Sequence, residues 1–116
     1  MIGAGDLEER FVFERDVAES DWSGHGGEPD WQPIAGPMAA GIQFMRGGEA
    51  VFSARLTARQ PAILTIRNSA EARGIKPSDR AKNVRTGEIF NIREKPREAK
   101  ESRGFLQMLV EAGVDG

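Results

Sequence analysis

Short alternations of apolar and polar residues, most of them followed closely by glycine or proline, constrain the fold of this chain more than any other sequence feature. In residues 7–17, Phe11 and Phe13 share one face of an extended segment. A period of two is typical of β-strands with one buried face. The same period recurs in residues 31–45, 62–67, 80–84, 88–93 and 104–112. We therefore expect a mainly β fold, a small antiparallel β-barrel of about six strands with long loops and at most one short helix.

The inward faces of these strands supply the expected barrel core. Its members are apolar residues in alternating positions: Phe11, Phe13, Ile42, Leu64, Ile66, Phe90, Ile92, Leu106 and Met108. Pro33 and Pro37 cannot donate ladder hydrogen bonds, so we expect their stretch at a sheet edge or a bulge. Gly87 closes a predicted hairpin turn and is expected to have a positive φ. Residues 104–112 are apolar on both faces, which predicts a central strand or one packed against a partner.

Three connections are less regular. Residues 49–58 predict a short helix or, alternatively, a flexible loop, and Pro61 ends this stretch. Residues 68–79 contain Gly74 and Pro77 and are predicted to be a plain connection, and residues 96–103 a charged loop.

The length of 116 residues suits a single domain, residues 1–116, and the composition excludes several classes. The chain has no cysteine, which excludes disulfides and cysteine-based zinc sites. No apolar run reaches the roughly 18 residues of a membrane helix. The N-terminus lacks the basic region followed by an apolar one that marks a secretory signal. We expect no membrane partner.

Charge is unevenly distributed along the chain. Residues 1–30, which include the glycine-rich loop at 18–30, carry nine acidic and two basic side chains, net −7; the remaining residues carry net +5, for a total of −2. These charges are either ordinary solvated surface, or an acidic segment that meets a basic face on its own body or on a neighbour. The candidate residues for a subunit or partner interface are Asp6, Glu8, Glu9, Trp22, Trp31, Arg80 and Arg93.

The sequence contains little evidence for a catalytic, metal-binding or nucleotide-binding site. His25 is the only histidine, and it lies in the glycine-rich loop without further soft ligands or a triad. Two glycine clusters, Gly3-Ala4-Gly5 and Gly24-His25-Gly26-Gly27, are not followed by the Lys-Ser/Thr pair of a phosphate-binding loop. The basic residues of the last third are interrupted by acidic ones, with no tyrosine or tryptophan between them for stacking on bases. We predict no catalytic residue, no metal and no cofactor.

Several motifs, read in order, resemble the phage head-tail joining family, also called head closure or stopper proteins. They are Gly5-Asp6-Leu7-Glu8-Glu9-Arg10 before the first strand, a polar loop ending at Trp31, Ala40-Gly41-Ile42 before Gly47-Gly48-Glu49, Leu64-Thr65-Ile66-Arg67, Gly74-Ile75-Lys76-Pro77-Ser78-Asp79-Arg80, and Gly87-Glu88-Ile89-Phe90-Asn91-Ile92. Each motif is degenerate alone, and the resemblance depends on their order and spacing over nearly the whole chain.

The resemblance implies a protein made in the host cytoplasm and built into the neck of a tailed phage or a phage-like particle such as a gene transfer agent. It implies a homo-oligomeric ring, six- or twelve-fold, with a portal or adaptor protein on one face. A tail terminator or another tail protein would meet the other face. Double-stranded DNA would be retained by the ring and would pass through it on ejection, without sequence specificity.

A nearly neutral subunit suits such a conduit, because every ionic phosphate contact is multiplied by the number of subunits. A few basic side chains on a movable loop would still slow DNA. The candidate channel loop is residues 46–60, with Arg46, Gly47, Gly48, Glu49 and Arg55 as its candidate gate. The alternatives are another neck or tail component, such as a largely helical adaptor or a tail terminator, and a cellular β-barrel interaction module.

Overall fold

The computed structural model describes residues 7–18, 28–45, 60–100 and 102–112, and these ranges contain seven strands and one short helix. The elements follow the chain in this order: β1 (Glu9–Asp16), β2 (Trp31–Phe44), β3 (Gln60–Arg67), α2 (Ala70–Arg73), β4 (Arg80–Asn83), β5 (Ile89–Ile92), β6 (Arg97–Ala99) and β7 (Ser102–Ala112). Within the described residues, no helix is long and apolar enough to cross a membrane.

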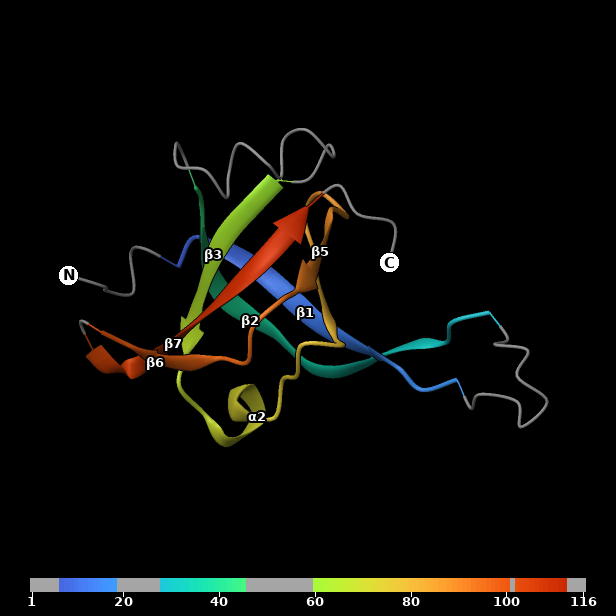
Figure 1. Cartoon of the computed structure of the whole chain (residues 1–116), viewed down its shortest axis with the longest axis horizontal. Coiled ribbons are helices and arrows are strands. Elements are labelled where there is room, and N and C mark those ends of the chain that lie inside the picture. The colour runs from blue at the N-terminus through green and yellow to red at the C-terminus, as the bar shows by residue number, and fades with distance from the viewer. Residues whose placement is uncertain (1–6, 19–27, 46–59, 101, 113–116) are drawn as a thin grey trace.

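Six of the strands close into an antiparallel barrel (Figure 1). The order around it is β3-β2-β1-β4-β5-β7, and the β3–β7 pairing completes the circle. β6 lies outside this circle and pairs only with the first half of β7. The predicted small antiparallel β-barrel is confirmed. So is the prediction of a central last strand, because β7 pairs with β3 on one side and with β5 and β6 on the other.

The barrel interior is filled by the inward residues of the alternating strands. Of the nine residues predicted for the core, eight are at most 2% exposed, and Ile42 is partly buried against them. The rings of Phe11 and Phe90 lie 5.7 Å apart at a tilted angle, which is a favourable geometry for aromatic pairs. Ile75, which follows α2, is also fully buried and helps to cover one end of the core.

The proline-containing part of β2 forms a bulge against β1. Phe11 is opposite Met38 and Phe13 is opposite Ala35, so Gly36 and Pro37 together face one residue of β1. Gly36 has φ +91°, and a Cβ atom there would lie 2.7 Å from the carbonyl oxygen of Phe11. Residues 31–39 pair with β1 alone, since β3 begins to pair only at Ala40. The predicted edge or bulge is therefore confirmed, and both features occur together.

Two local predictions are wrong. Residues 68–79 contain the helix α2, which begins after Ser69, whose hydroxyl oxygen accepts the N–H of Ala72 at 3.0 Å. Residues 96–103 are not a loop, because Arg97 pairs with Gln107 and Glu98 with Leu106 to form β6. The helix predicted as one alternative at residues 49–58 lies outside the described residues.

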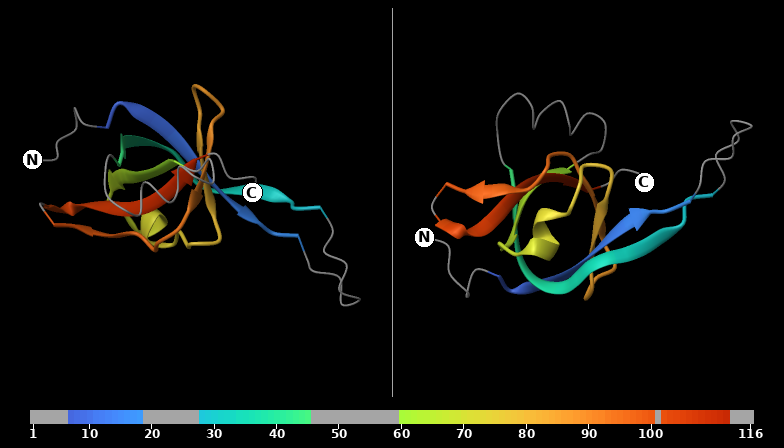
Figure 2. Two further views of the ribbon diagram at one scale, coloured as in Figure 1. Left: turned by 45° about the horizontal axis from the view of Figure 1, so that its top comes forward. Right: turned by 90° about the horizontal axis from the view of Figure 1, so that it is seen from below.

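Two hairpins extend from the barrel in opposite directions. β1 and β2 run beyond it at one end of the long axis, and the β6–β7 hairpin lies at the other end (Figure 1). Two further views show the same separation (Figure 2). Between β4 and β5, Gly87 has the predicted positive φ, +77°, and its N–H donates to the carbonyl oxygen of Asn83 at 2.8 Å.

Candidate functional site: a projecting arm with a charged base

The extended part of the β1–β2 hairpin is the most prominent feature outside the barrel (Figure 2). We call its described residues, 14–18 and 28–33, the arm. Its strands stay paired, with Glu14 opposite Pro33 and Asp16 opposite Trp31. Asp16 Oδ1 accepts the backbone N–H groups of Ala18 at 3.0 Å and of Asp30 at 2.9 Å. These two hydrogen bonds hold the pKa of the Asp16 carboxyl below its ordinary value.

A buried carboxylate holds the base of the arm to the barrel. Asp79 is 1% exposed, and Arg15 donates to it twice, Nε to Oδ1 at 2.8 Å and Nη2 to Oδ2 at 2.9 Å. The N–H of Lys76 donates to Oδ2 at 2.8 Å, and Arg15 Nη2 also reaches the carbonyl oxygen of Gly74 at 3.0 Å. The hydrogen bonds to Asp79 raise the pKa of Arg15. β1 is thereby fixed to the connection between α2 and β4.

A second ion pair lies on the neighbouring side of the arm. Arg80 Nε donates to Glu14 Oε1 at 2.8 Å, and both side chains are largely buried. The guanidinium of Arg80 also lies 4.2 Å from the centre of the Trp31 ring, a cation–π distance. Trp31 is therefore covered on one face by its own chain.

A third ion pair joins the start of β1 to the β4–β5 turn. Arg85 Nη2 donates to Glu9 Oε1 at 2.6 Å, and Asn83 Nδ2 approaches Glu9 Oε2 at 3.4 Å. The hydrogen bond from Arg85 lowers the pKa of Glu9, and the same bond raises the pKa of Arg85. The Arg85 side chain is 69% exposed, so solvent screens this pair.

Part of the acidic N-terminal region meets basic residues of the same chain, which is one of the alternatives that the charge distribution left open. Glu9 and Glu14, from the acidic N-terminal region, meet basic residues of their own chain, one of which is Arg80. Arg93, another predicted interface residue, pairs with Glu111 at 3.2 Å. Glu8 is exposed. An interface role for these residues stays a prediction.

Other predicted site residues lie outside the described residues. They are Asp6 and Trp22 of the predicted interface and the gate residues Arg46, Gly47, Gly48, Glu49 and Arg55. His25, for which no site was predicted, also lies outside the described residues. The two residues that make the strongest contact of the arm, Arg15 and Asp79, were not singled out from the sequence. No spacing rule would have paired them, because 64 positions separate them.

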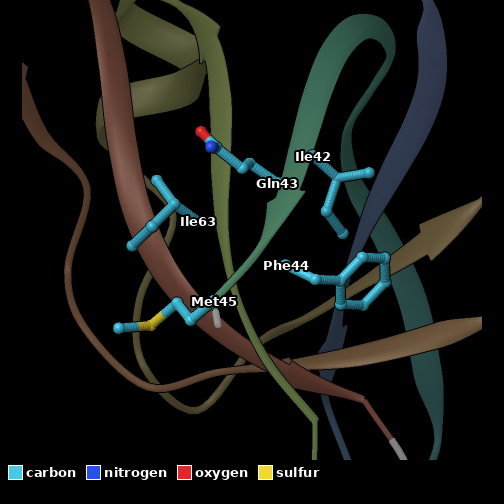
Figure 3. Close-up of a pocket in the computed structure, with 5 residues that line it drawn as sticks. All are labelled: Ile42, Gln43, Phe44, Met45 and Ile63. Atoms are coloured by element: carbon cyan, nitrogen blue, oxygen red, sulfur yellow. The ribbon is translucent and has the colours of Figure 1, made fainter. Parts of the chain in front are cut away.

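The ends of β2 and β3 form a second candidate surface, a hollow lined by Ile42, Gln43, Phe44, Met45 and Ile63 (Figure 3). Phe44 and Met45 are more than a third exposed. The Phe44 ring lies 6.1 Å from that of Phe90, so it covers the end of the barrel core. Met45, which lines this hollow, is the last described residue before the predicted channel loop.

The described residues offer ion pairs and exposed surfaces that could bind a partner. Among the described residues, no group of three or more histidine, cysteine, aspartate or glutamate side chains is placed to hold a metal ion. The perturbed groups, Glu9, Arg15, Asp16 and Arg85, are all explained by the hydrogen bonds described above.

Comparisons with known proteins agree with this geometry. A family model described as phage head completion protein matches residues 2–113. The solution structure of protein SF1141 from Shigella flexneri 2a superposes with a TM-score of 0.67 at 20% identity, covering 99% of this chain and 100% of that one. A chain from the virion of a native gene transfer agent particle gives a TM-score of 0.63 at 24% identity, covering 94% and 97% of the two chains. No curated protein matches the sequence significantly.

Proposed function

The chain belongs to the phage head completion protein family, and from this premise we propose that its copies form a ring in the neck of a tailed phage or phage-like particle. The family is structural, and its members are components of the virion, where this chain acts at the head or neck. In the proposal, one face of the ring meets the portal or adaptor and the other meets the tail. The ring retains the packaged DNA and lets it pass on ejection.

The family match to residues 2–113 carries the proposal, because it includes every strand of the barrel and both strands of the arm. A rigid closed barrel is a suitable unit for a ring, since it has few free strand edges that would pair with the wrong partner. The arm adds a surface at one end of the long axis (Figure 1). Two different surfaces on each copy are what a closed cyclic assembly requires.

The charge of the chain also supports a conduit for DNA. A subunit of net charge −2 does not hold the phosphate backbone strongly by itself. In a ring, each additional phosphate contact would be repeated in every copy and would slow the passage of DNA. A weakly charged barrel therefore favours passage without sequence preference.

Of the alternatives, an adaptor was expected to be largely helical, whereas α2 is the only helix in the described residues and has four residues. A tail terminator is the second candidate, because it too would be a ring at the neck. It differs in what its loss would change: the length of the tails rather than the retention of DNA in the heads.

Particles produced without this protein test the proposal. We expect DNA-filled heads and complete tails to accumulate unjoined, with the heads losing nuclease-protected DNA, and the wild-type gene supplied in trans to restore joined particles. Electron microscopy and the amount of protected DNA measure both effects. Joined particles that keep their DNA in the absence of the protein would overturn the proposal. If the heads keep their DNA and the tails have an abnormal length, the result would favour the tail-terminator function over the proposed one.

A further inference from the structure

The arm retains an acidic surface after its internal ion pairs are formed. Its basic residue, Arg15, is held by Asp79, and Glu14 is neutralised by Arg80. Asp16, Glu28 and Asp30 are exposed, and no ion pair joins them to a basic side chain in the described part of the chain. Val17, beside Asp16, is 47% exposed. The arm thus presents an apolar side chain among acidic ones.

The opposite end of the molecule has the reverse charge. We call residues 95–100 and 102–103, which form the β6–β7 hairpin, the basic hairpin. Its exposed cations are Lys95, Arg97, Lys100 and Arg103. The acidic residues of this segment are Glu94, Glu98 and Glu101, so the sequence from 94 to 103 carries a net charge of +1. Among the described residues of the segment, only Arg97 and Glu94 form an ion pair, at 3.5 Å. Both side chains of that pair are well exposed, so it is weak and can exchange for another partner.

A groove of about 380 Å³ lies between the basic hairpin and the outer face of the barrel. Ile63 and Leu109, which pair across β3 and β7, contribute apolar lining. The charged lining consists of the basic Lys95, Arg97 and Lys100 and the acidic Glu94 and Glu98. The groove thus combines apolar side chains with three basic and two acidic ones, a net excess of one positive charge, which suits the exposed Val17 and the acidic residues of the arm.

The arm and the basic hairpin of one copy lie at opposite ends of the long axis (Figures 1 and 2), so the arm cannot reach the groove beside the hairpin of its own chain. A contact between them therefore joins two copies. Because it uses a different surface on each copy, it is heterologous, the type of contact that builds a ring when the rotation between successive copies closes. Arg80, Arg85 and Arg93 are engaged within the chain, which leaves the basic hairpin as the better partner for the arm.

We propose that the acidic arm of each copy docks in the groove beside the basic hairpin of the next copy. This inference rests on the proposed ring and specifies the surfaces that build it. The bound partner is a second copy of this chain, and the contact is head-to-tail.

Cysteine cross-linking in assembled particles tests the contact directly, because the chain has no cysteine of its own. The test chain carries Glu28→Cys and Lys100→Cys, and a second version carries Glu28→Cys and Lys95→Cys. A short bis-maleimide should link such chains into a ladder of multimers that ends at the closed ring, whereas each single variant should give no ladder. The matched control carries Glu28→Cys and Val84→Cys, since Val84 is 52% exposed on the β4–β5 turn. It should give no ladder.

The outcomes separate this inference from the proposed function. Particles that contain the protein in a ring by microscopy, but show no ladder with either test pair or the same ladder with the control pair, would overturn the docking and leave the ring intact. Particles that lack the protein would overturn both.

A charge exchange provides an independent test. Glu28→Lys with Asp30→Lys, or Lys95→Glu with Lys100→Glu, should each abolish self-assembly, and the two sets combined in one chain should restore it. Mixing the two reversed proteins should also restore rings, in which the two proteins alternate, because the reversed arm of one meets the reversed groove of the other and the native arm meets the native groove. Sedimentation velocity measures these states. Rings that form from either reversed protein alone would contradict the proposal.

Discussion

Arg15 and Asp79 are 64 positions apart in the sequence, and they form a two-point ion pair with N–O distances of 2.8 and 2.9 Å. The Asp79 carboxylate is buried, whereas the Arg15 side chain is about one-third exposed. The pair joins β1, where the arm begins, to the segment between α2 and β4. This ion pair therefore holds the arm in its position relative to the barrel.

Removal of the Asp79 carboxylate should destabilise the protein. Asp79→Ala leaves the N–H of Lys76 and the guanidinium of Arg15 without their acceptor, and we expect a loss of about 2 kcal/mol in the free energy of unfolding. Urea unfolding followed by circular dichroism measures the change. Arg97→Ala, which removes a cation from the exposed pair with Glu94, is the control and should change stability by less than about 0.5 kcal/mol. Equal effects of the two substitutions would contradict the structural role of Asp79.

The bulge in β2 should accept only glycine at position 36. Gly36→Ala combines a positive φ with a Cβ atom 2.7 Å from the Phe11 carbonyl oxygen, so we expect a loss of about 2 kcal/mol or more. Gly87→Ala has a positive φ but open space around it, and about 1 kcal/mol is expected. Gly104→Ala meets only ordinary contact and should be nearly neutral. A different order of the three unfolding free energies would show that the bulge is not formed as described.

The free energy of unfolding should fall in acid because the carboxylates of Glu9 and Asp16 become protonated. Both carboxyl groups have folded-state pKa values below their ordinary values, so the unfolded chain binds more protons in the acid range. Their contribution is complete above about pH 4.5, the ordinary value for glutamate, and is lost as the pH falls through the lowered folded values. Unfolding free energies measured from pH 7 to pH 3 test this. Glu9→Gln and Asp16→Asn should each flatten the profile, and an unchanged slope in both variants would refute the assignment.

Self-assembly should weaken as salt concentration rises. The proposed contact joins exposed acidic and basic side chains, and mobile ions screen such pairs within about 8–10 Å at physiological ionic strength. Sedimentation velocity over a sodium chloride titration measures the ring fraction. The doubly neutralised arm, Glu28→Gln with Asp30→Asn, should show a smaller dependence on salt. Assembly that is unchanged or strengthened by salt would count against an electrostatic contact.

The barrel could be predicted from the sequence because its signals are local. Alternation places Phe11 and Phe13, or Leu106 and Met108, on one face regardless of the rest of the chain. Proline in β2 and glycine in the β4–β5 turn act on their own backbone, so the bulge and the turn were equally readable. Each of these features depends on residues within a few positions of one another.

The short elements and the charged contacts could not be predicted in the same way. α2 has four residues and β6 has three, too few for a periodic pattern, and β6 exists because β7 offers it a free edge. Trp31 and Arg80 were both singled out for an interface, but their mutual contact depends on β1 lying between β2 and β4. Which opposite charges meet is decided by the tertiary fold.

The central claim is that copies of this barrel form a ring at the neck of the particle. Cryo-electron microscopy of assembled particles, at a resolution that traces strands, tests it most directly. We predict a closed ring of six-stranded barrels between head and tail, with each arm directed to the neighbouring copy and the DNA path on the ring axis. A neck without this barrel, or copies located elsewhere in the particle, would contradict the account.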